Sequence, residues 1–150
     1  MNIRTAKVTD AKEIHELIEF YANNGKMLHR SLNTIYETIQ EFVIVERDCK
    51  IVACGALHVS LENLAEIKSL AVNKDFVGRG IGRNIVEKLQ LNAKNLGVNK
   101  IFVLSFSPIF FIKLGFVIIP KEMLPYKIWT ECVNCHLFPN CGETSLLFSM

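Results

Sequence analysis

The pattern of hydrophobic and polar positions is most regular between residues 64 and 97, where it changes from a strand-like to a helical period. Leu64–Val72 mixes apolar and β-branched side chains over the length of a buried strand. Apolar residues then recur three and four positions apart, on one helical face formed by Ile81, Ile85, Leu89, Ala93 and Leu96. Gly97 stands where such a helix would end. The pattern predicts a strand, a glycine-rich turn and a helix at the centre of the chain.

Shorter runs of the same two periods predict the other elements. Helices are expected after Asp10, which with Glu13 would form a capping pair, after Ser31, and from Pro108. Strands are expected at residues 3–8, 42–46, 51–59, 100–104 and 116–119, with an edge strand at 144–148. Residues 47–50 should form the turn of a hairpin between 42–46 and 51–59, and Glu62 and Asn63 should form another turn into the central strand. Because a helix links the strands ending at Val72 and beginning at Lys100, these two should run parallel.

This order of elements predicts an α/β fold with a mixed central sheet of six to seven strands, flanked by about four helices. No linker, repeat or low-complexity run interrupts the chain. We therefore expect one domain over residues 1–150, with the cysteine-containing segment 121–150 as its extension.

Composition narrows the class of protein. Half of the residues are apolar and 21% are charged, which is typical of a folded globular chain. A net charge of +2 is too small to predict a nucleic-acid partner. No apolar run approaches the ~20 residues that span a bilayer, and no signal segment is recognisable. The odd number of cysteines favours reduced thiols. We expect a cytoplasmic protein with neither nucleic-acid nor membrane partners, and a homodimer stays an open alternative.

Three alternating glycines, Gly78, Gly80 and Gly82, precede the central helix. They leave successive backbone amides uncovered at a helix N-terminus, which is a site for a phosphate group. The spacing is neither GxGxxG nor the GK[ST] loop of nucleoside triphosphatases. A side chain added at Gly80 is expected to block this site without disturbing the fold.

The segment AEIKSLAVNKDFVGRGIG resembles motif A of the GNAT N-acetyltransferases, and FFIKLGF at residues 110–116 is similar to the family's FYxKLGF. The family pattern Q/R-x-x-G-x-G/A aligns with residues 77–82, although Val77 replaces Gln or Arg. The resemblance covers roughly residues 2–119 and implies acetyl-coenzyme A (acetyl-CoA) as co-substrate, wedged where strands 4 and 5 splay. It implies cofactor contacts from Leu70, Ala71, Val72, Val77, Gly78, Arg79, Gly80, Ile81, Gly82, Arg83 and Phe111.

The same resemblance implies that Glu66, within AEI, is the general base that accepts the proton of the attacking amine. Lys68 lies on the same strand face, so an ion pair between the two side chains is the alternative interpretation. Backbone amides of residues 70–72 would stabilise the oxyanion. Phe111 replaces the tyrosine that usually protonates the leaving thiolate, and Tyr126, Ser107 or no residue at all would then serve.

Longer strings, among them MLHRSLNTIYETIQEFVIVE and LPYKIWTECVNC, resemble the stand-alone N-acetylglutamate synthases of arginine biosynthesis. His29 departs from this family's LPRS motif. The resemblance implies L-glutamate as acceptor, with Arg30 and Lys68 each meeting one carboxylate. Two alternatives stay open: a GNAT enzyme for another small amine or a protein amine, and a non-catalytic CoA-binding sensor, which the residues at Val77 and Phe111 would suit.

Cys132, Cys135 and Cys141 form the other unusual pattern. Three thiols are one ligand short of a closed structural zinc site, which Cys54 or a water would have to complete. We expect no metal and interpret the cysteines as reduced residues packing a small loop, with a zinc site as the alternative.

Overall fold

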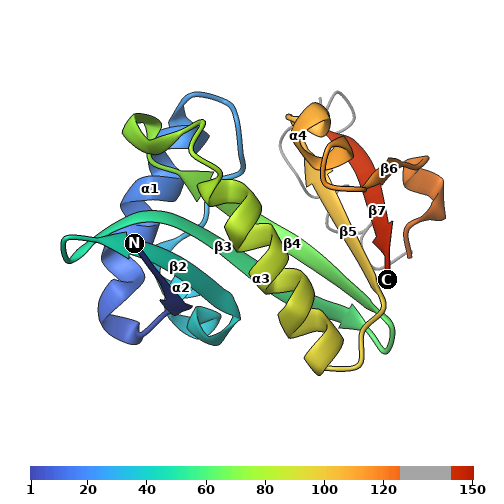
Figure 1. The fold of residues 1–150 in the computed structure, drawn as a ribbon, viewed down its shortest axis with the longest axis horizontal. Coiled ribbons are helices and arrows are strands. Elements are labelled where there is room, and N and C mark those ends of the chain that lie inside the picture. Colours follow the sequence, from blue (N-terminus) through green and yellow to red (C-terminus); the bar gives the residue numbers. More distant parts are fainter. Residues whose placement is uncertain (126–142) are drawn as a thin grey trace.

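The computed structural model describes residues 1–125 and 143–150. In this part of the chain, seven strands form one mixed sheet in the order β1-β2-β3-β4-β5-β7-β6 (Figure 1). The strands are β1 (Asn2–Thr5), β2 (Phe42–Arg47), β3 (Lys50–Leu61), β4 (Leu64–Val72), β5 (Lys100–Ser105), β6 (Val117–Ile118) and β7 (Thr144–Ser149). The α-helices are α1 (Ala11–Asn23), α2 (Leu32–Glu37), α3 (Ile81–Asn95) and α4 (Pro108–Ile112), and short 3-10 helices lie at η1 (Val8–Asp10), η2 (Ile39–Glu41), η3 (Lys74–Phe76) and η4 (Lys121–Met123). The predicted α/β fold with a mixed sheet is confirmed.

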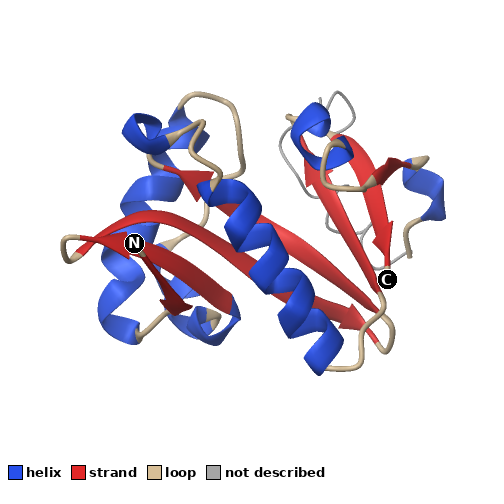
Figure 2. Cartoon of the chain, in the orientation of Figure 1, coloured by secondary structure: helices blue, strands red, loops and turns tan. Residues whose placement is uncertain are grey.

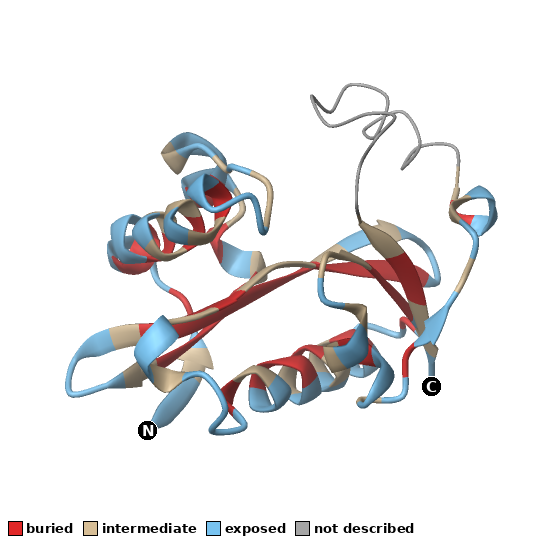
Figure 3. Ribbon diagram, turned by 90° about the horizontal axis from the view of Figure 1, so that it is seen from above, coloured by how far each residue is buried: buried red, intermediate tan, exposed pale blue. Residues whose placement is uncertain are grey.

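Helices α1 and α2 cover one face of the sheet, and α3 covers the other (Figure 3). On the first face, Ile14, Ile18 and Ile35 from the helices pack against sheet residues that include Ile44 and Cys54. On the second face, the apolar stripe of α3 packs against sheet residues that include Val43, Leu57 and Ile67. No helix in the described ranges is long and apolar enough to cross a membrane.

The central helix ends as its sequence predicts. Gly97 has a φ of 85°, its N–H donates to the carbonyl of Lys94 at 3.0 Å, and the N–H of Val98 donates to Ala93 at 2.9 Å. This pair of bonds satisfies carbonyls that the last helical turn leaves open, and the left-handed residue between them favours glycine. Val98 then leads directly into the buried part of β5.

The start of α1 differs from the prediction. Asp10 makes no side-chain capping bond to α1; its carboxylate accepts the Lys7 N–H at 2.7 Å and bonds the Arg4 guanidinium at 2.8 and 3.0 Å. Glu13, the expected second member of the pair, accepts the N–H of Ile51 instead. A guanidinium offers two charge-assisted bonds to the carboxylate, which outweigh one neutral cap. Asp10 therefore links β1 to the turn before α1.

The two hairpins around β3 are confirmed. Between β2 and β3, Asp48 and Cys49 have φ values of 53° and 63°, as in the two-residue turn that matches the twist of antiparallel strands. The turn between β3 and β4 is held from outside, because the Asn63 side chain accepts the Asn99 N–H at 2.7 Å. This bond fixes the start of β4 beside the start of β5.

Strand β7 was expected at the sheet edge and lies inside the sheet instead. Its residues pair antiparallel with all of β5, from Lys100 opposite Ser149 to Ser105 opposite Thr144. The two-residue strand β6 pairs with the other side of β7 and forms the edge. Strand β5 loses its pairing with β4 after three residues, so its regular partner has to come from the outer side. The long strand β7 provides this partner.

Candidate active site

Strands β4 and β5 pair only at their first residues. Leu64, Ala65 and Glu66 face Lys100, Ile101 and Phe102 in parallel register, and no further pair follows in the described chain. Figure 2 shows the two strands close together at their start and diverging towards their ends. Within the described chain, backbone groups of β4 beyond Glu66 are therefore without a strand partner on this side. We call this divergence the opening; it confirms the predicted splay between strands 4 and 5.

A bulge at Ser69 changes the direction of β4 within the opening. Ala56 pairs with Lys68 and Cys54 pairs with Ala71, so Gly55 faces two residues, Ser69 and Leu70. Ser69 has a φ of 55°, which is uncommon for a residue other than glycine. Leu70 and Val72 consequently pack on the α3 side, and Ala71 packs on the α1 side. The predicted oxyanion donors thus lie just beyond the bulge.

The glycine loop leads into α3 as an open helix N-terminus. Gly78 and Gly80 have φ values of 83° and 79°, and a Cβ added to either would meet nothing within 4 Å. Gly80 directly precedes α3, and no side chain in residues 1–125 or 143–150 caps the helix. The first-turn amides of Ile81, Gly82 and Arg83 therefore keep their donors directed out of the helix. This geometry fits a phosphate-bearing group such as the pyrophosphate of CoA.

Gly80 and Gly82 differ in what an added side chain would meet. Gly80 adopts the left-handed region, so any side chain there strains the backbone. The expectation that a side chain at this position would leave the fold undisturbed is therefore wrong. Gly82 has an ordinary helical backbone, but an added Cβ would lie 3.2 Å from the Phe110 ring of α4. Gly82 therefore allows α4 and the first turn of α3 to approach each other.

The charged residues of the loop take different directions. The Arg79 guanidinium stacks 5.0 Å from the centre of the Phe76 ring, and Arg47 of β2 lies 5.6 Å from the same ring. Arg83 bonds Glu87 at 2.9 Å, one turn along α3. Val77 is exposed. Arg79 thus lies over Phe76 and Arg83 lies along α3, and the contacts of Val77, Arg79 and Arg83 with acetyl-CoA stay predictions.

Glu66 is nearly buried, at 8% exposure, and stands where the opening begins. The Lys68 Nζ lies 3.7 Å from its Oε1, which confirms that both side chains share one face and form an ion pair. That pair was the alternative to the catalytic interpretation, but the two are compatible, because a base must be held as a carboxylate before it accepts a proton.

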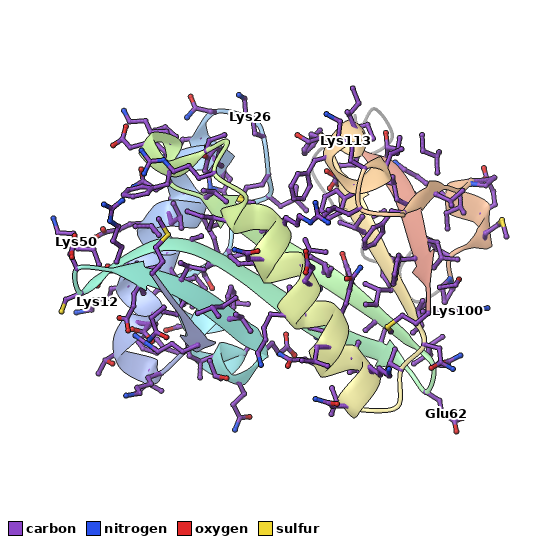
Figure 4. All side chains as sticks on the ribbon, in the orientation of Figure 1. Lys12, Lys26, Lys50, Glu62, Lys100 and Lys113 are labelled. Atoms are coloured by element: carbon purple, nitrogen blue, oxygen red, sulfur yellow. The ribbon has the colours of Figure 1, made fainter. Side chains whose placement is uncertain are left out.

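Arg30 lies half-buried in the connection between α1 and α2. The preceding residue, His29, bonds Glu19 of α1 at 2.8 Å and so ties the connection to the helix. Within the described residues, Arg30 itself makes no hydrogen bond or ion pair. Lys26 of this connection and Lys113 beside α4 lie on opposite sides of the opening (Figure 4). The connection that carries Arg30 therefore borders the opening, and its role in substrate binding stays a prediction.

Phe111 and the expected proton donors are placed less favourably. Phe111 is 3% exposed and makes edge-to-face contacts with Phe110 and Phe116, with ring centres 5.0 and 5.3 Å away. Its aromatic ring is part of the core, which accounts for a residue without a hydroxyl. Ser107 is exposed, and its N–H donates to Ser105 Oγ at 2.9 Å. Tyr126 lies outside the described residues.

Of the cysteines considered for a metal site, the structure describes only Cys54. Cys132, Cys135 and Cys141 lie outside the described residues. Cys54 is fully buried in β3, its thiol donates to the Ser69 carbonyl, and burial raises its pKa to about 12. Because zinc binds the thiolate, Cys54 is not a suitable fourth ligand. Residues 1–125 and 143–150 contain no cluster of three or more His, Cys, Asp or Glu side chains that would hold a metal ion.

Sequence reasoning missed the pair formed by His58 and Glu41. His58 of β3 stands directly opposite Glu66 in the antiparallel register, and its Nδ1 lies 2.9 Å from Glu41 Oε2 of η2. Successive side chains of a strand alternate between its two faces, so the sequence alone does not tell which face His58 occupies or which residue it stands opposite. A histidine four residues before the predicted turn at Glu62 was the only available signal.

Comparison with known proteins agrees with this site. The family model for the acetyltransferase (GNAT) domain matches residues 38–118, just over half of the chain. An uncharacterized N-acetyltransferase of Chlorobaculum tepidum is 39% identical over 97% of this chain and 94% of its own length. An amino-acid acetyltransferase of Mycobacterium tuberculosis is 38% identical over 86% of this chain and 75% of its own length.

A solved structure shares the fold. The N-acetylglutamate synthase of Neisseria gonorrhoeae, in complex with coenzyme A and N-acetyl-glutamate, superposes with a TM-score of 0.92 at 26% identity. The match covers 99% of this chain and 34% of that protein, so the chain spans about a third of the longer synthase. With the splayed sheet and the glycine loop, these similarities show that the chain belongs to the GNAT acetyltransferase family and is an acetyl-CoA-dependent acyltransferase.

Proposed function

We propose that the protein transfers the acetyl group of acetyl-CoA to the α-amine of L-glutamate, the reaction that begins arginine biosynthesis. The observation that carries the proposal is the position of Glu66, nearly buried beside Lys68 where β4 and β5 separate. The M. tuberculosis relative, named an amino-acid acetyltransferase, and the Neisseria synthase support a free amino acid as acceptor.

The loop before α3 would hold the pyrophosphate of acetyl-CoA. Gly78 and Gly80 leave open space above the loop, and the uncapped amides of the first helical turn supply donors and the positive end of the helix dipole. Acetyl-CoA supplies a thioester, whose carbonyl carbon the amine attacks. As the C–N bond forms and the C–S bond breaks, CoA leaves as a thiolate, which takes up a proton from the amine or from solvent; a thiol with a pKa near 8.5 is a good leaving group. The β4 backbone beyond the Ser69 bulge has no β5 partner within the described residues and would donate to the carbonyl oxygen as negative charge develops there.

Glu66 would accept the proton of the amine, directly or through water. An amine with a pKa near or above 8 is mostly protonated at pH 7 and is then not a nucleophile. The Lys68 ammonium lies 3.7 Å from the carboxylate that would accept this proton. Such proton transfer typically contributes about 10²- to 10⁴-fold to the rate.

Glutamate carries two carboxylates, and two of the cations near the opening are suited to meet them. Lys68 lies on the face of β4 that Glu66 occupies, and Arg30 lies on the bordering connection. We assign one carboxylate to each. The planar guanidinium of Arg30 suits bidentate recognition, and its lack of an ion pair within the described residues leaves its donors to a ligand.

The experiment is a measurement of thiol release from acetyl-CoA with glutamate, aspartate, glutamine, a polyamine and a peptide N-terminus as acceptors. We expect the highest kcat/KM with glutamate. A preference for the polyamine or the peptide would instead support the enzyme for another amine. Thermal stabilisation by CoA, without turnover of any acceptor, would support the non-catalytic sensor.

A further inference from the structure

A histidine and a carboxylate stand beside Glu66 without a part in the reaction as described so far. His58 Nδ1 and Glu41 Oε2 are 2.9 Å apart, and the two side chains are 34% and 29% exposed. Glu41 ends η2, immediately before β2, and His58 lies near the end of β3. The pair therefore joins two neighbouring elements at the sheet end where β4 and β5 meet.

The strand register places this pair next to the base. His58 faces Glu66, and the preceding residue Leu57 faces Ile67. Leu57 and Ile67 both pack on the α3 side, so His58 and Glu66 point to the opposite face, as Lys68 does. Directly opposite residues of this kind have Cβ atoms about 5 Å apart. Across the sheet, the described side chains run in the order Glu41, His58, Glu66, with Lys68 beside Glu66.

The partner of His58 determines which ring nitrogen carries the proton. An ionised carboxylate only accepts hydrogen bonds, so the Nδ1 that faces Glu41 must be the donor. The neutral imidazole then has its lone pair on Nε2, on the side of the ring away from Nδ1. Hydrolytic triads use a carboxylate in the same way to orient a histidine.

Each turnover would leave one proton on Glu66, whose side chain is only 10% exposed. We propose that His58, oriented by Glu41, takes this proton from Glu66 and releases it to solvent. In each cycle the amine proton passes to the Glu66 carboxylate, from there to His58 Nε2 directly or through one water, and then to bulk water. Glu66 is thereby returned to its carboxylate form, and His58 to its neutral form. The relay rests on the proposed acetyl transfer.

The test compares three variants with the wild type: His58→Gln, Glu41→Gln and the control His15→Gln. His15 lies on α1 and also faces a glutamate, Glu19, at 3.8 Å. We expect His58→Gln to lower kcat about 10- to 100-fold and to leave KM for acetyl-CoA within about twofold. Added imidazole should restore part of the rate, because it replaces the missing base. Glu41→Gln should lower kcat less, and His15→Gln should match the wild type.

A second readout does not depend on activity. Nitrogen-15 NMR of the histidine rings should show His58 as the Nδ1–H tautomer in the wild type and as a mixture of tautomers in Glu41→Gln. If His58→Gln does not fold, Glu41→Gln and His58→Asn test the relay in its place.

A wild-type kcat in His58→Gln, or a loss that imidazole does not reverse, would overturn the relay and leave the proposed function standing. A wild type that acetylates no acidic amino acid would overturn both.

Discussion

Glu66 and Phe102 are the last parallel partners of β4 and β5, and the sheet opens directly beyond them. Phe102 is fully buried and packs with Leu64 and Leu124, so apolar side chains fill the junction of the two strands. Glu66 stands at this junction, where a substrate would enter between the strands. A carboxylate on a packed strand is positioned more accurately than one on a loop.

A side chain at Gly80, the glycine preceding α3, should weaken acetyl-CoA binding in addition to straining the backbone. Gly80→Ala and the control Gly97→Ala replace glycines with φ values of 79° and 85°, each with open space around the new Cβ. Both should lower stability by about 1 kcal/mol, measured by thermal unfolding without ligand. Only Gly80→Ala should raise KM for acetyl-CoA.

Ligand-induced stabilisation checks the same point. The wild type and Gly97→Ala should gain about 2.7 kcal/mol at a hundredfold excess of CoA over Kd, and Gly80→Ala should gain much less at that concentration. Equal gains in all three proteins would mean that the loop does not hold the phosphates.

The bulge at Ser69 should matter through its backbone. Ser69→Val places a β-branched residue at a φ of 55°, which should cost about 1–2 kcal/mol and lower kcat as the bulge shifts. Ser69→Gly tolerates this φ and should keep most of the activity. Ser60→Val, on β3 with an ordinary φ, is the matched control and should be neutral. If Ser69→Gly is as inactive as Ser69→Val, the serine side chain rather than the bulge is required.

Arg30 should act on glutamate and not on acetyl-CoA. Arg30→Lys keeps the charge and removes the planar pair of donors, which should raise KM for glutamate about tenfold, equivalent to about 1.4 kcal/mol. Lys26→Gln removes a charge from the same connection and should change this KM less than twofold. Similar effects of the two variants would indicate a general electrostatic attraction instead of a specific contact.

The free energy of unfolding should depend on pH through Asp10 and Glu46, the two carboxyl groups that Arg4 bonds. The Arg4 guanidinium lies 2.8 Å from Asp10 and 3.1 Å from Glu46, and these bonds lower the pKa of both carboxyl groups. A lowered pKa contributes stability that is fully present above the ordinary value, 3.8 for Asp10, and is lost as the pH falls through the folded-state value.

Arg4→Gln should therefore be less stable than the wild type at pH 7, by about 1 kcal/mol in urea unfolding. The difference should shrink as the pH is lowered below about 4. A difference that stays constant down to pH 3 would mean that Arg4 stabilises the fold by packing alone.

The sequence predicted the elements well where local signals are strong. Gly97 ends α3, Ser31 caps α2 through the Thr34 N–H at 3.1 Å, and the β2–β3 hairpin forms at the expected turn. Each of these depends on residues only a few positions apart. The parallel pairing of β4 and β5 was also predicted, because a crossover helix leaves little choice.

The misplaced features depend on distant residues. The inner position of β7 depends on the short pairing between β4 and β5, and Asp10 is drawn from the α1 cap by Arg4. The proximity of His58 to Glu66 depends on strand register, and the left-handed conformation of Gly80 on how the loop joins α3. None of these relationships leaves a periodic pattern in the sequence.

The central claim, acetyl transfer to glutamate with Glu66 as base, is tested most directly by identifying the product. Wild type and Glu66→Gln are incubated with acetyl-CoA and nitrogen-15 glutamate, and the products are identified by mass spectrometry. We expect labelled N-acetylglutamate from the wild type and at least about 100-fold less from Glu66→Gln, which should still be stabilised by CoA. No labelled product from the wild type, or equal amounts from both proteins, would contradict the account.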